Sequence, residues 1–125
     1  GGYVLLDHPD PKLLFIATGS EVNIAIQAAR ELKVAGISAR VVSMPCAELF
    51  CLQDKEYRDR VLPPNLLNRI AIEALHKDYW YKFVGLSGIV IGMETFGESA
   101  PGDVLMQEFG FTEENLVNVA KGMLS

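Results

Sequence analysis

Apolar residues along this chain form short unbroken runs that alternate with stretches of helical spacing. Residues Leu13–Ala17 are apolar without interruption, which is typical of a strand buried on both faces of a sheet. After Ser20, a favourable helix N-cap, apolar residues recur every three or four positions as far as Leu32. Gly36 ends this predicted helix, and residues 40–43, which contain Val41 and Val42, are predicted to form the second strand. A strand, a helix and a strand in this order predict two parallel strands.

Further runs predict the remaining elements. Strands are expected at Tyr3–Leu6, Arg69–Glu73 and residues 89–91. Helices are expected in the second half of residues 48–61, over residues 78–84, between Pro101 and Gly110, and after Thr112, which caps the last one. Together these elements predict an α/β fold, a three-layer α/β/α sandwich with a mainly parallel sheet of about five strands. The short segment Tyr3–Leu6 is expected at the sheet edge or antiparallel to the rest.

Composition narrows the class of protein. The 125 residues suit one domain, half of them are hydrophobic, and 22% are charged, which excludes a disordered chain. A net charge of −5 makes nucleic acid and anionic membranes unexpected partners. No apolar run approaches the roughly 20 residues of a membrane span, and no signal-peptide pattern is present. Two cysteines make no disulfide framework, so we expect a cytoplasmic protein.

The chain begins Gly1-Gly2-Tyr3, without a methionine. We therefore expect residues 1–125 to be a processed product or an excised fragment of a longer chain.

Metal and hydrolase sites are poorly supported. Cys46 and Cys51 are too far apart for a zinc pair and have no second pair of ligands, so both are predicted to be small buried hydrophobic residues. His8 and His76 are interpreted as solvated loop residues. Ser99 resembles a nucleophile in a glycine-containing turn, but no histidine follows it in the chain, and it is interpreted as a helix cap.

The turn Thr18-Gly19-Ser20 follows a strand and precedes a helix N-terminus, where an anion could bind. It has one glycine and no lysine, so neither the P-loop nor the dinucleotide-binding pattern is met. The pattern favours a plain connection between strand and helix, and leaves weak anion binding open.

Two other groups of side chains are candidates for function. Three carboxylates lie at or near strand ends, where α/β proteins often place their active sites: Glu73, Glu94 and Glu98. Their spacing in the sequence matches no known catalytic pattern. A possible interface is formed by Tyr79, Trp80 and Tyr81, because tyrosine and tryptophan are enriched in interfaces as well as in cores.

Several segments together resemble one family. Five segments are similar, in the same order along the chain, to signatures of the transketolase C-terminal domain. They are residues 14–21 (LFIATGSE), 39–45 (ARVVSMP), 78–85 (DYWYKFVG), 96–101 (FGESAP) and 108–112 (EFGFT). The DYWYK and FGESAP elements are the specific ones. His76-Lys77 and Phe50-Cys51 depart from the usual pattern, which puts the local loop shape in doubt.

The resemblance implies a role within a larger enzyme. Transketolase transfers a two-carbon ketol unit between sugar phosphates in the pentose phosphate pathway, with thiamine diphosphate and a divalent metal, Mg²⁺ or Ca²⁺. In that family the cofactor and the reacting carbon are held by two other domains, and the C-terminal domain packs on them and supports the homodimer. No catalytic, cofactor-binding or metal residue is therefore expected within this chain, which is predicted to be inactive alone.

Two alternatives stay open on the sequence alone. The first is a regulatory module that binds phosphate or nucleotides. The second is the equivalent domain of a related thiamine-diphosphate enzyme, such as a 2-oxo acid dehydrogenase beta subunit or a deoxyxylulose phosphate synthase.

Overall fold

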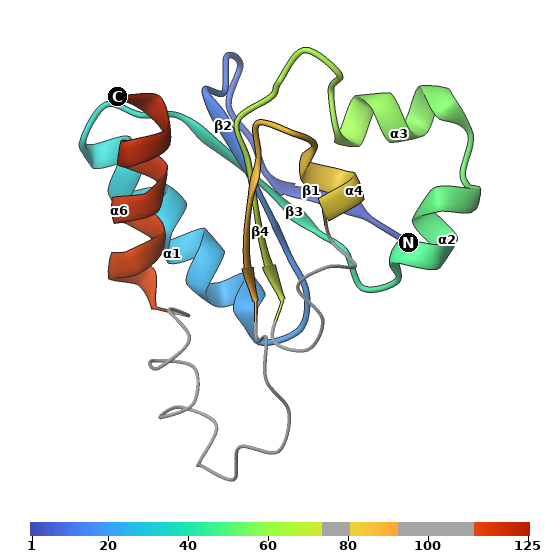
Figure 1. Ribbon diagram of the computed structural model, residues 1–125, viewed down its shortest axis with the longest axis horizontal. Helices are drawn as coiled ribbons and strands as arrows, with labels where there is room; N and C mark the ends of the chain where they lie inside the picture. Colours follow the sequence, from blue (N-terminus) through green and yellow to red (C-terminus); the bar gives the residue numbers. More distant parts are fainter. Residues whose placement is uncertain (74–80, 93–111) are drawn as a thin grey trace, which may run out of the picture.

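The computed structural model describes residues 1–73, 81–92 and 112–125 (Figure 1). The strands are β1 (Tyr3–Leu6), β2 (Leu13–Ala17), β3 (Ala39–Ser43), β4 (Arg69–Glu73) and β5 (Ile89–Gly92). The helices are α1 (Glu21–Val34), α2 (Ala47–Leu52), α3 (Lys55–Val61), α4 (Tyr81–Val84) and α6 (Glu113–Leu124). The predicted helix between Pro101 and Gly110 and the first part of the one predicted over residues 78–84 lie outside the described residues.

The five strands form one sheet in the order β1-β3-β2-β4-β5. Strands β2, β3, β4 and β5 pair in parallel, with Phe15 of β2 between Val41 and Ile70 in register. Strand β1 pairs antiparallel with β3 at the edge, with an irregularity between Val4 and Leu6. The predicted sheet, including its antiparallel edge strand, is confirmed.

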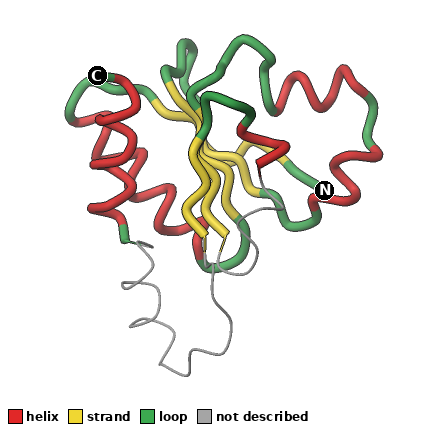
Figure 2. The backbone as a smooth tube through the Cα atoms, viewed as in Figure 1, coloured by secondary structure: helices red, strands yellow, loops and turns green. Residues whose placement is uncertain are grey.

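Helices cover both faces of the sheet, so the predicted three layers are also confirmed. Helices α1 and α6 lie on one side, and α2, α3 and α4 lie on the other (Figures 1 and 2). Since side chains alternate along a strand, β2 sends Leu13 and Phe15 into the core under α1 and α6, and Leu14 and Ile16 into the opposite core. All residues of β2 are buried, as a central strand between two helical layers requires.

Helix α1 ends as predicted but begins differently. Gly36 has a φ of 86°, and the N–H groups of Gly36 and Ile37 donate to the carbonyls of Lys33 and Leu32, which is the Schellman arrangement. Ser20 was expected to cap the first turn with its side chain. It takes helical backbone angles, φ −68° and ψ −22°, and its hydroxyl makes no capping bond, so this prediction is wrong.

The segment after β3 contains one helix more than predicted. Helix α3 matches the predicted second half of residues 48–61, and the Asp54 side chain caps it by accepting the Tyr57 N–H at 2.8 Å. Helix α2 precedes it and buries Ala47 and Phe50. Helix α2 has only six residues, too few for a clear helical repeat, which is why periodicity missed it.

Helix α6 begins as predicted. The Thr112 hydroxyl accepts the Asn115 N–H at 3.1 Å, and Leu116, Val117 and Ala120 are buried against the core shared with α1.

Candidate functional site

The turn Thr18-Gly19-Ser20 leaves the carboxyl end of β2, the side of a parallel sheet where ligands usually bind. Gly19 has a φ of 61°, a backbone conformation that favours glycine. The N–H groups of Glu21 and Val22 donate to the carbonyls of Thr18 and Gly19, both at 3.3 Å. The first helical N–H groups therefore already have acceptors within the turn.

A carboxylate also lies beside this turn. Glu21 is only 6% exposed, and its Oε2 would stand 3.6 Å from a Cβ added at Gly19. A negative side chain at a helix N-terminus complements the helix dipole and competes with an external anion. An anion site at this turn stays a prediction, and the geometry supports it weakly.

The other predicted residues are only partly described. Glu73 ends β4 opposite Gly92 of β5, and Tyr81 begins α4. His8 lies in the loop after β1, where its backbone N–H donates to the side chain of Asp7 at 2.8 Å. Six candidates lie outside the described residues: His76, Tyr79, Trp80, Glu94, Glu98 and Ser99. The predicted interface of Tyr79, Trp80 and Tyr81 therefore stays a prediction.

Both cysteines are free thiols, but they are not the buried residues we expected. Cys46 is partly buried, and Cys51 is exposed on α2. Phe50 takes the buried position of that helix turn, which leaves its neighbour Cys51 outside the core. The described residues contain no cluster of three His, Cys, Asp or Glu side chains that could hold a metal ion.

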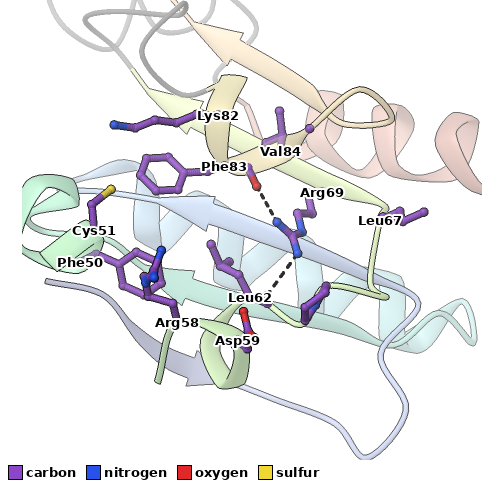
Figure 3. A pocket seen from close by; sticks show the side chains of 12 residues that line it. Phe50, Cys51, Arg58, Asp59, Leu62, Leu67, Arg69, Lys82, Phe83 and Val84 are labelled. Atoms are coloured by element: carbon purple, nitrogen blue, oxygen red, sulfur yellow. Dashed lines mark hydrogen bonds between the residues drawn. The ribbon is translucent and has the colours of Figure 1, made fainter. Parts of the chain in front are cut away.

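A pocket of about 480 Å³ lies between α2, α3, the start of β4 and α4. Phe50, Leu62 and Phe83 supply apolar walls, while Arg58 and Arg69 supply charge (Figure 3). The Phe50 and Phe83 rings meet edge to face with centroids 6.2 Å apart, a favourable aromatic geometry that fixes one wall.

Arg69 organises the wall of this pocket at the start of β4. Its Nε donates to the Leu66 carbonyl at 2.9 Å, and its Nη1 donates to the Phe83 carbonyl at 2.8 Å. Its Nη2 donates to the carbonyls of Pro63 at 2.7 Å and Leu62 at 3.3 Å. One guanidinium thus joins the loop after α3, the start of β4 and the end of α4 (Figure 3).

The charged side chains around the pocket differ in the groups that surround them. Burial lowers the pKa of Arg69 by desolvating its cation, and the nearby Asp59 carboxylate opposes this effect. Asp59 itself pairs with Lys55 at 2.7 Å. Arg58 donates from Nε to the Gln53 carbonyl at 3.0 Å, and the Lys82 ammonium lies 5.2 Å from the centre of the Phe83 ring. Among the described residues, the lining therefore contains more cations than carboxylates.

Sequence reasoning missed this pocket. Its members come from four separate elements, and one of these, α2, was not predicted. The one available signal was Arg69, a cation at the first position of a strand whose next three residues are apolar, a few residues after Pro63-Pro64.

Comparison with known proteins identifies the family. The model of the transketolase-like C-terminal domain matches residues 1–112. The chain belongs to this family. Transketolase 1 of Escherichia coli (strain K12) is 54% identical over 125 residues, which cover 99% of this chain and 19% of that protein. Transketolase 2 of Aliivibrio fischeri is 56% identical over 126 residues, which again cover 19% of its length.

Solved transketolases share the fold of this C-terminal domain. The transketolase from Leishmania mexicana matches 98% of this chain and 18% of its own, with a TM-score of 0.88 and 40% identity. The chain thus spans about a fifth of the length of the relatives that it matches. The similarity along the whole chain favours transketolase over a regulatory module or a related thiamine enzyme. No helix in the described part of the chain is long and apolar enough to cross a membrane.

Proposed function

We propose that this chain is the C-terminal domain of a cytoplasmic transketolase. The full-length enzyme would transfer a two-carbon ketol unit between sugar phosphates in the pentose phosphate pathway. The observation that carries the proposal is 54–56% identity to named transketolases over essentially the whole chain.

Thiamine diphosphate and Mg²⁺ or Ca²⁺ would supply the carbanion chemistry of the full-length enzyme. The described residues of this chain contain no cluster of three His, Cys, Asp or Glu side chains that could by itself hold the metal. We therefore assign no step of ketol transfer to them. Two other domains of the full-length chain would bind the cofactor.

The role proposed for this chain is structural. It would pack on the other transketolase domains and support a homodimer, with Tyr79, Trp80 and Tyr81 as candidate contacts. The two apolar cores support this role, since they hold a rigid sheet on which such contacts could be presented.

A transketolase assay of two proteins tests the proposal. The full-length protein is expected to convert a ketose phosphate and an aldose phosphate when thiamine diphosphate and Mg²⁺ are present. Residues 1–125 under the same conditions are expected to show no turnover. Turnover by residues 1–125 alone would contradict the structural role, and an inactive, folded and cofactor-loaded full-length protein would contradict the assignment to transketolase.

A further inference from the structure

The pocket between α2, α3 and α4 joins an apolar wall to a surplus of positive charge. We propose that it binds a small organic anion, a carboxylate or phosphate group attached to an apolar or aromatic body. This inference does not rest on the proposed transketolase activity.

The apolar half of the pocket is preformed. Phe50, Leu62, Phe83 and Val84 are all buried residues of the core on this side of the sheet, and they also line the pocket. The two phenyl rings already pack edge to face, with centroids 6.2 Å apart, so this wall has a defined shape before any ligand binds. The volume of about 480 Å³ lies within the range of roughly 300–1,000 Å³ that small-molecule sites occupy.

Arg58 supplies the donors that an anion would need. Its Nε is occupied by the Gln53 carbonyl, whereas its two Nη groups have no hydrogen-bond partner among the described residues. The paired N–H groups of a guanidinium match the geometry of a carboxylate or phosphate. Asp59, the carboxylate among the described lining residues, is paired with Lys55 and forms no ion pair with Arg58.

Arg69 contributes positive charge to the site rather than free hydrogen-bond donors. Four of its hydrogen bonds go to backbone carbonyls, so its side chain is fixed in place. Carbonyl dipoles stabilise the cation without cancelling its charge, and its pKa is lowered by desolvation. An anion held at Arg58 would gain from this second fixed charge. The whole chain carries a net charge of −5, which makes a local surplus of cations more distinctive.

Isothermal titration of the full-length protein tests the site with four probes. Phenyl phosphate and benzoate carry both an anionic group and a ring, whereas inorganic phosphate lacks the ring and benzyl alcohol lacks the charge. We expect phenyl phosphate or benzoate to bind with a Kd on the order of 1 mM, and the other two probes to bind at least about 5-fold more weakly. The better of the two aromatic anions identifies the preferred anionic group.

Two variants, each of which removes one positive charge, test whether the aromatic anion binds at Arg58. Arg58→Gln should weaken binding of the aromatic anion at least about 5-fold, which corresponds to about 1 kcal/mol. Arg30→Gln, at an exposed position of α1 on the opposite side of the sheet, should leave it unchanged. Equal affinity of Arg58→Gln and the unaltered protein, or no saturable binding by either aromatic anion at 10 mM (about ten times the expected Kd), would overturn the proposal.

Alkylation of the two thiols by iodoacetamide gives a second readout. Cys51 lines the pocket and is exposed, whereas Cys46 is not in the lining. Saturating phenyl phosphate or benzoate is expected to slow labelling of Cys51 at least about threefold and to leave the rate at Cys46 unchanged. Binding without protection of Cys51 would place the ligand elsewhere and would also overturn the proposal.

Discussion

Helices α1 and α6 cover one face of the sheet by apolar packing, whereas the opposite face adds side-chain hydrogen bonds to backbone carbonyls. Under α1 and α6, alanines and leucines of two long helices meet the strands directly. Small residues such as Ala25, Ala28 and Ala29 let α1 approach the sheet closely. Helices of 14 and 12 residues supply enough surface to seal this face.

The face under α2, α3 and α4 has two helices of only six and seven residues, and four described residues of α4. Polar side chains join the pieces. Arg40 pairs with Asp7 at 2.9 Å and donates to the carbonyls of Arg60 and Val61, and the Tyr57 hydroxyl donates to the Gly2 carbonyl. Short helices leave gaps between their ends, and the pocket at Arg69 is such a gap. Long helices thus seal a core, while short helices joined by arginines leave space for a ligand.

The largest effect is expected from a cavity on the sealed face. Leu32→Ala removes a fully buried side chain of α1 and should lower the free energy of unfolding by about 3 kcal/mol, because the rigid layer cannot collapse around the cavity. Urea unfolding of residues 1–125 measures it. Val34→Ala in the same helix is the control, since Val34 is 91% exposed and its loss should change stability by less than about 0.5 kcal/mol. Equal effects would show that this face is not closely packed.

A smaller effect is expected from removing the arginine that joins the opposite face. Arg69→Met keeps an apolar stem but leaves four carbonyls without their charged donor, and should cost about 2 kcal/mol in urea unfolding. Water can satisfy part of this loss because Arg69 is not fully buried. Arg30→Met on the outside of α1 is the control and should be neutral. A loss below about 0.5 kcal/mol would mean that apolar packing alone holds this face as well.

The same contrast between the two faces of the sheet explains which parts of the fold and of the candidate site could be predicted from the sequence. Every strand in the described part of the chain was predicted, because apolar runs such as Leu13–Ala17 indicate burial directly. Helix α1 was predicted from its periodicity and its end from Gly36. Helix α2 was missed because its six residues are too few to show a clear helical repeat. The pocket was missed because the hydrogen bonds of Arg69 join residues whose proximity arises only when the chain folds. The exposure of Cys51 was also missed, because composition cannot tell which of two adjacent residues, Phe50 or Cys51, faces the core.

The smallest effect on stability is expected at the first turns of α1 and α6, the two long helices on the sealed face. Thr112→Ala removes the acceptor of the Asn115 N–H and should lower the unfolding free energy by about 1 kcal/mol. Ser20→Ala should change it by less than about 0.5 kcal/mol, because the Ser20 hydroxyl makes no capping bond. Urea unfolding of both variants tests the pair. If Ser20→Ala lowers the free energy of unfolding as much as Thr112→Ala does, the Ser20 hydroxyl caps α1 as the sequence predicted. A neutral Thr112→Ala would mean that packing of Leu116 and Val117, rather than the cap, fixes the start of α6.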